Sequence, residues 1–268
     1  MQANERILAY YNLGQESARL SGPSLERLRT ESILRRFLPA APATILDIGG
    51  ADGVYAFPLA QAGYRVHLVD PIPLHVQQAQ RRSESTGIFL ASITEGDARS
   101  LRFDDSSANG VLYLGPLYHL SSLTDRLLAL REAHRTLKSG RVLIAAFISK
   151  YASLLDGLAR NFLERDEFAE IVKQDLKDGR HRNPTNEPMF FTDAQFHHPK
   201  EARSEIQQAG FKDVRLLAIE GPAWLVDRIQ ARLEQPQLAE RILSFIEQVE
   251  EEEALLGASG HFLGVARK

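Results

Sequence analysis

The chain has 268 residues, 44% of them hydrophobic and 25% charged, and this globular balance excludes wholesale disorder. Its formal net charge of −3 gives no general attraction to nucleic acid or to an anionic membrane, which favours a small-molecule partner. The absence of cysteine excludes disulfides, thiolate metal ligands and cysteine nucleophiles. Because no stretch reads as a signal peptide or as an apolar membrane span, we expect a cytoplasmic protein.

The first segment, residues 1–38, carries apolar side chains at near-helical spacing. We predict two amphipathic helical pieces there, separated at Ser21-Gly22-Pro23. Pro39 and Pro42 then end the segment before the first strand.

Residues 44–53 are predicted to form a short buried strand, a tight glycine turn and the start of a helix. Gly49, Gly50 and Gly53 permit backbone torsions and a close ligand approach that side chains would block. The turn should therefore be a binding loop at a helix N-terminus.

The spacing of this turn argues against a dinucleotide. A G-x-G-x-x-G fingerprint starting at Gly49 would require glycine where the chain has Ala51 and Val54. Asp47, at the end of the strand, would repel a pyrophosphate but attract a cationic, amine-bearing ligand.

A second strand is predicted over residues 65–70, and it ends in Asp70. A carboxylate at the tip of this strand can accept hydrogen bonds from both hydroxyls of a ribose. Dehydrogenases use the same device, and the alternative role for Asp70 is a helix N-cap before Pro71.

The α/β alternation continues beyond this point. Further strands are predicted later in the chain, over residues 88–93, 110–114, 142–147, 214–220 and 261–266. Residues 149–198 interrupt the pattern with helical pieces and a polar, proline-bearing stretch.

Three motifs together resemble those of the class I S-adenosylmethionine-dependent methyltransferases. They are Asp-x-Gly-x-Ala-x-Gly over residues 47–53, Gly96-Asp97-Ala98 after the third strand, and Leu114-Gly115-Pro116-Leu117-Tyr118-His119-Leu120 after the fourth. The last resembles the string found in small-molecule members, whereas the Asn/Asp-Pro-Pro-aromatic motif of nucleic-acid base methyltransferases is absent. Ala51 stands where the family usually has glycine, which predicts some backbone strain or a slightly altered turn at that position.

The resemblance implies an α/β fold with a doubly wound, seven-stranded, mostly parallel sheet and helical lid segments. Its last strand is expected to be antiparallel. The implied organisation is an N-terminal lid (1–38), an S-adenosylmethionine-binding core (39–148), an insertion over the active site (149–198) and a C-terminal part of the sheet with a helical excursion (199–268).

The resemblance also implies S-adenosylmethionine as cofactor, with S-adenosylhomocysteine as product. In the implied site Asp97 and Ala98 contact the adenine, and the lid contributes Tyr11 and Arg19, although that lid could equally be an aromatic staple packing a helix on the sheet. The expected cofactor-binding residues are Tyr11, Arg19, Asp47, Gly49, Gly50, Gly53, Asp70, Pro71, Asp97, Ala98, Leu114 and Gly115.

The sequence says less about the residues that contact the methyl acceptor. His119 is the candidate general base because an imidazole pKa near 6.5 suits proton removal at neutral pH, although it could instead cap a helix or contact the sulfonium. The substrate-binding candidates are Tyr118, Phe191, Phe196, His197 and Trp224. His197 and His198 are adjacent, but neighbouring side chains on a strand diverge, so no metal is expected.

The sequence therefore predicts transfer of a methyl group to O, N or C of a small-molecule acceptor, without a nucleic-acid or membrane partner; monomer and homodimer both stay open. One alternative is a protein that binds S-adenosylmethionine for a structural role or a rearrangement, without methyl transfer. A nicotinamide-dependent oxidoreductase is a further alternative, which the glycine spacing and Asp47 oppose.

Overall fold

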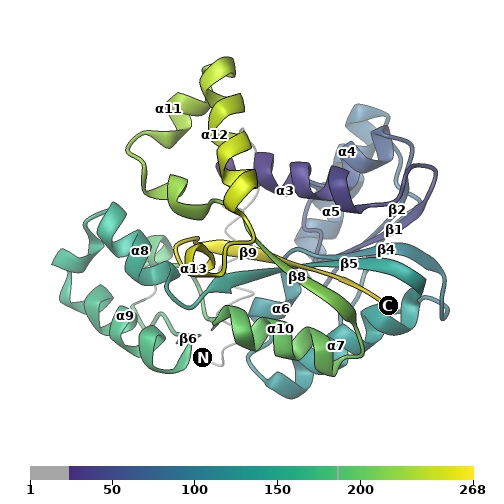
Figure 1. The fold of residues 1–268 in the computed structure, drawn as a ribbon. Helices are drawn as coiled ribbons and strands as arrows, with labels where there is room; N and C mark the ends of the chain where they lie inside the picture. The colour runs from purple at the N-terminus through teal and green to yellow at the C-terminus, as the bar shows by residue number, and fades with distance from the viewer. Residues whose placement is uncertain (1–23, 186) are drawn as a thin grey trace.

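A nine-stranded sheet with helices on both faces forms the centre of the computed structural model, which describes residues 24–185 and 187–268 (Figure 1). Seven strands run in the spatial order β3-β2-β1-β4-β5-β9-β8, and β9 is antiparallel to both of its neighbours. These strands are β1 (Thr44–Ile48), β2 (Arg65–Asp70), β3 (Ser92–Glu95), β4 (Ala108–Tyr113), β5 (Leu137–Ser149), β8 (Lys212–Ala218) and β9 (His261–Arg267). The doubly wound, mostly parallel sheet is thereby confirmed.

Two helical layers cover the sheet, as Figure 1 shows, with α7 and α10 on one face and α3, α4 and α5 on the other. The helices are α3 (Leu25–Phe37), α4 (Ala56–Gln61), α5 (Pro73–Thr86), α6 (Pro116–His119), α7 (Leu123–Thr136), α8 (Ala152–Ala159), α9 (Asp166–Asp178), α10 (Pro199–Gln208), α11 (Ile229–Leu233), α12 (Pro236–Val249) and α13 (Glu253–Leu256). Short 3-10 turns are η1 (Phe162–Glu164), η2 (Pro188–Phe190) and η3 (Gly221–Leu225).

The first strand shows how the sheet divides the core. Ile45 packs into the cluster under α3 and α4, while Leu46 and Ile48 pack into the cluster under α7 and α10. Because side chains alternate along a strand, Asp47 lies on the same face as Ile45. This alternation places a carboxylate inside an apolar layer, next to the glycine turn.

The strand boundaries differ from the sequence prediction, most clearly in the third strand and in the insertion. The third strand is β3 at residues 92–95 rather than 88–93, because the preceding residues join the sheet only through Ala91 N and Val66 O, 2.8 Å apart, while Phe89 is 74% exposed. The insertion adds two short strands, β6 (Arg180–His181) and β7 (Ala194–His197), and β7 continues the sheet beside the end of β5.

A buried ion pair fixes α3 to the C-terminal helical excursion. The guanidinium of Arg29 is fully buried and bonds the carboxylate of Glu250 and, over 3.1 Å, the carbonyl oxygen of Ile219. Arg36 also donates to Glu250, at 2.7 Å. Moving α3 away from α12 would separate these charges and leave a buried charge without its partner. This cost holds α3 over the sheet.

The helices were compared with the length and hydropathy that a membrane-spanning helix requires. Among residues 24–185 and 187–268, none of the helices has both the length and the apolar character that crossing a bilayer requires.

Candidate functional site

A cavity of about 400 Å³ lies at the carboxyl ends of β1, β2, β3 and β4, where ligands bind in open α/β sheets. Its lining is continuous from the glycine turn to β9. Its described lining includes Glu26, Thr30, Asp47, Gly49, Gly50, Ala51, Asp70, Pro71, Gly96, Asp97, Ala98, Arg99, Leu114, Gly115, Tyr118, His119, Asp125, Ala146, Ile219, His261 and Leu263.

The glycine turn approaches the cavity through backbone alone. Gly49 and Gly53 have φ of 70° and 86°, and a Cβ added at Gly50 would lie 2.7 Å from Oδ2 of Asp47. Only glycine leaves this space open. Ala51 has φ of 48°, so the strain expected at this departure from the family pattern is confirmed.

Replacing Ala51 with glycine should raise the free energy of unfolding by up to about 1 kcal/mol, because left-handed strain outweighs the entropy that glycine adds to the unfolded chain. Ala62, with φ of −79°, provides the control, since Ala62→Gly should lower stability by about 0.5–1 kcal/mol. Urea denaturation measures both variants. A loss of stability in Ala51→Gly would argue against strain at this turn.

Asp47 carries an unsatisfied buried charge. The residue is 1% exposed, and neither carboxylate oxygen has a hydrogen-bond partner within the part of the chain that the structure describes. Burial, and then the charge of Asp70, raise the pKa of Asp47 to about 7. A carboxylate aimed into a cavity without a protein partner is suited to a cationic ligand.

Asp70 joins the glycine turn to the start of α5. Its Oδ2 accepts from the Ala51 amide at 2.9 Å, and its Oδ1 accepts from the Ile72 amide at 2.9 Å and lies 3.0 Å from Nδ1 of His75. The alternative N-cap role is wrong, because α5 begins at Pro73 with Ile72 as its N-cap and has no side-chain cap; Asp70 instead accepts from the backbone two residues further on. Asp70 also lines the cavity, where a carboxylate oxygen with one protein donor retains a second acceptor position.

Asp97 lines the same cavity but is already paired. Arg99 Nε donates to its Oδ1 at 3.0 Å, and Arg99 also reaches Asp125 at 3.2 Å. The hydrogen bonds from Arg99 lower the pKa of Asp97 despite partial burial. The sequence prediction missed Arg99, although its place two residues after Asp97 in a turn was the available signal.

The string after β4 forms a single turn, α6, at the cavity wall. Tyr118 and His119 both line the cavity, and their rings meet edge to face at 4.7 Å. Burial lowers the pKa of His119 to about 4, against smaller opposing effects from a backbone bond involving Asp193 and the charge of Asp70. His119 is therefore neutral at physiological pH and a weak proton acceptor.

Replacing His119 with glutamine should leave the affinity for S-adenosylhomocysteine and the pH dependence of turnover between pH 5.5 and 8.5 unchanged. The reason is that an imidazole with a pKa near 4 does not titrate in this range. Steady-state rates across that range measure it. Loss of a rate limb between pH 6 and 7 would restore His119 as the base.

The insertion stands beside the cavity rather than in it. Within the described chain, none of the lining residues comes from 149–198. Phe196 is buried and stacks on His181, and His197 is 1% exposed with Nε2 3.4 Å from Glu205, so neither contributes to the cavity. Phe191 reaches it only indirectly, with its ring centroid 6.3 Å from that of His119.

The remaining predicted residues are His198, Tyr11, Arg19 and Trp224. His198 caps α10, accepting from the Lys200 amide at 3.2 Å. Tyr11 and Arg19 lie outside the described residues, and so does the side chain of Trp224, whose backbone is part of η3.

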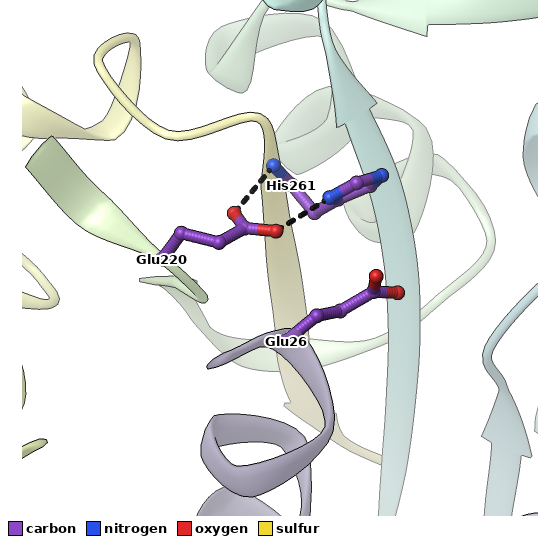
Figure 2. A group of neighbouring side chains, drawn as sticks. All are labelled: Glu26, Glu220 and His261. Atoms are coloured by element: carbon purple, nitrogen blue, oxygen red, sulfur yellow. Dashed lines mark hydrogen bonds and ion pairs between the residues drawn. The ribbon is translucent and has the colours of Figure 1, made fainter. Parts of the chain in front are cut away.

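The other half of the cavity contains residues that the sequence prediction missed. Glu26 and Thr30 come from α3, and Ile219 and His261 come from the ends of β8 and β9. Glu26, His261 and the neighbouring Glu220 have ligand atoms within 4.8 Å of one another (Figure 2).

Comparison with known proteins shows similarity to methyltransferases. Residues 45–140 match the family model described as a methyltransferase domain. A curated relative from Zymomonas mobilis, the ubiquinone/menaquinone biosynthesis C-methyltransferase UbiE, is 30% identical over 135 residues, which is 50% of this chain and 53% of the relative. The chain thus spans about half the length of the curated relative it matches.

Solved structures agree with the fold over most of the chain. A Haloferax volcanii protein described as a methyltransferase, in complex with the Trm112 methyltransferase activator, aligns with a TM-score of 0.62 at 18% identity, over 99% of this chain and 97% of that one. Phosphoethanolamine N-methyltransferase 2 of Haemonchus contortus, solved with S-adenosyl-L-methionine, aligns with a TM-score of 0.57 at 18% identity, over 88% of this chain and 51% of that one.

Proposed function

Because residues 45–140 match the model of a methyltransferase domain and form part of a doubly wound sheet, we propose that this chain transfers a methyl group from S-adenosylmethionine to a small-molecule acceptor. The observation that carries the proposal is the buried carboxylate of Asp47, without a protein partner in the described chain, facing a cavity beside a glycine turn.

The cofactor is S-adenosylmethionine, and the residues present fit it. Asp47 would pair with the ammonium of its amino-acid part, and Asp70 would accept from the ribose hydroxyls. Gly50 leaves the space beside Asp47 that a Cβ would fill. When bound, the cofactor supplies a sulfonium methyl group that a nucleophile attacks in line, which discharges the sulfur.

The chain's own contribution is alignment and exclusion of water. The loops after β1, β2, β3 and β4 fix one half of the cavity, and Ala146, Ile219 and Leu263 provide an apolar wall for the other half. Holding two reactants in line in such a site supplies much of the rate acceleration. A cavity of about 400 Å³ is in the range of small-molecule sites.

Two competing functions lead to different results. A nicotinamide oxidoreductase would need a pyrophosphate next to Asp47, which like charge opposes. A protein that binds S-adenosylmethionine without transferring its methyl group would keep every cofactor contact named above and differ only on the acceptor side.

Calorimetric titration with S-adenosylhomocysteine and, separately, with NADH tests the cofactor. We expect binding of the first and none of the second; the reverse pattern would refute the proposal. Incubation of a metabolite extract with methyl-labelled S-adenosylmethionine then tests transfer, and label recovered only in unreacted cofactor would favour the binding protein.

A further inference from the structure

Glu220 and His261 form a hydrogen-bonded pair at the acceptor half of the cavity (Figure 2). Oε1 of Glu220 lies 2.7 Å from Nδ1 of His261, and Oε2 accepts from the backbone amide of His261 at 2.9 Å and from the hydroxyl of Ser259 at 2.8 Å. A carboxylate can only accept, so Nδ1 is the donor and the lone pair of the neutral imidazole is on Nε2. In Figure 2 this nitrogen is at the end of the ring away from Glu220.

The pair is well separated from the half of the cavity that holds Asp47. His261 opens β9 and pairs with Ile148 at the carboxyl end of β5, so it lies at the same edge of the sheet as the glycine turn. Three strand spacings separate β1 from β9, which is about 14 Å. His261 is 28% exposed on its side chain and lines the cavity, so a molecule between these two points can contact it.

The hydrogen bonds favour proton transfer over metal binding. Three ligand atoms of Glu26, Glu220 and His261 lie within 4.8 Å of one another, a distance at which an ion could be held. However, both oxygens of Glu220 and Nδ1 of His261 are used in bonds to one another or to Ser259. The carboxylate of Glu220 therefore orients the ring of His261, as a carboxylate does in a carboxylate-histidine pair in which the histidine acts as a base.

The charges around the pair select the acceptor. The carboxylates of Glu220, Glu26 and Asp156 act on His261, from the end of β8, from α3 and from α8. Among the described residues, Glu26 is the carboxylate that lines the acceptor half, with Glu220 beside it. The other lining carboxylates belong to the cofactor half, where Asp97 and Asp125 are paired with Arg99. An anionic acceptor would meet like charge here, whereas an ammonium group would be attracted.

Resting on the proposed function, we propose that the acceptor is an amine that arrives protonated, and that His261 is the catalytic residue that removes its proton, with Glu220 as positioning residue. The ammonium transfers one proton to Nε2 of His261. The lone pair so released forms the new C–N bond as the C–S bond breaks and its electrons stay on sulfur. The products are an N-methylammonium, S-adenosylhomocysteine and an imidazolium, which returns its proton to water.

The first experiment identifies the class of acceptor. The protein is incubated with methyl-labelled S-adenosylmethionine and a metabolite extract, and labelled products are sorted by mass spectrometry. Label in N-methyl groups is expected. Label confined to O-methyl or C-methyl groups, or no labelled product from a protein that binds S-adenosylhomocysteine, overturns the inference while leaving the cofactor assignment intact. Absence of S-adenosylhomocysteine binding would instead refute the proposed function.

The second experiment tests His261 with the amine so identified. His261→Gln should lower kcat by about 10²- to 10⁴-fold at pH 7. The deficit should shrink about tenfold for each pH unit toward the pKa of the amine, near 10 for an alkyl ammonium, because solvent then supplies the neutral amine. Glu220→Gln should lower kcat less and shift the pH profile, while KM for S-adenosylmethionine stays constant.

The control is His134→Gln, since His134 lies on α7 against Phe211 and outside the cavity lining. It should leave kcat and the pH profile unchanged. Thermal melting and S-adenosylhomocysteine titration confirm that each variant is folded. A His261→Gln deficit that is the same at every pH, or no deficit, excludes His261 as the proton acceptor.

Discussion

Replacing Asp47 with asparagine is expected to weaken binding of S-adenosylhomocysteine by about tenfold to hundredfold, because a charged hydrogen bond to the ligand ammonium is lost. The same substitution should stabilise the ligand-free protein, since it removes a buried charge that has no partner in the described chain. Opposite effects on binding and on stability distinguish a ligand contact from a residue that serves the fold.

The pH dependence of stability follows from the raised pKa. Between its ordinary value of 3.8 and about 7, Asp47 holds more proton in the folded than in the unfolded protein, so stability falls as pH rises through this window. The rise corresponds to about 4 kcal/mol of destabilisation at pH 8. The stability gained by Asp47→Asn should therefore grow from pH 5 to pH 8.

Urea denaturation and calorimetric titration at several pH values measure both effects. In the wild type, affinity for S-adenosylhomocysteine should rise with pH up to about 7, because the ligand selects the ionised carboxylate. Asp52→Asn is the matched control: Asp52 carries the same charge in the same turn, 3.9 Å from Arg82 and outside the cavity lining. Equal affinity in wild type and Asp47→Asn would exclude the ammonium contact.

Replacing Asp70 with alanine should also weaken S-adenosylhomocysteine binding, by about 1–3 kcal/mol, through the lost bonds to the ribose. Unlike Asp47→Asn, it should destabilise the free protein, because the amides of Ala51 and Ile72 lose their acceptor. It should also lower the pKa of Asp47, since the charge of Asp70 contributes to raising it.

The same titrations test this second variant. The pH at which affinity levels off should move below about 7 in Asp70→Ala. Unchanged affinity would count against the ribose contact, and an unchanged pH profile would count against the coupling of the two carboxylates.

The cofactor half of the cavity was predictable because its determinants are local in sequence. The strand over residues 44–48, the turn that follows it and the acid at the end of the next strand lie within one β-α-β unit, and hydrophobic runs with glycine punctuation define such a unit. The unusual torsion of Ala51 was implied by the resemblance, since the family usually has glycine at that position.

The acceptor half was not predictable in this way because distant segments form it. Glu26 and His261 are far apart in the chain, and they meet only because β9 inserts between β5 and β8 and α3 packs above them. The prediction placed residues 149–198 over the site, but they pair with the end of β5 and flank it instead. His119 lines the cavity, but the burial that lowers its pKa arises from tertiary packing, which the sequence does not reveal.

A crystal structure with S-adenosylhomocysteine bound tests the central claim most directly, since it shows which groups the two acidic strand ends contact. We predict the ligand's ammonium within hydrogen-bonding distance of Asp47 and its ribose hydroxyls on Asp70. A nucleoside bound elsewhere, or one whose ammonium and ribose both avoid these carboxylates, would contradict the account.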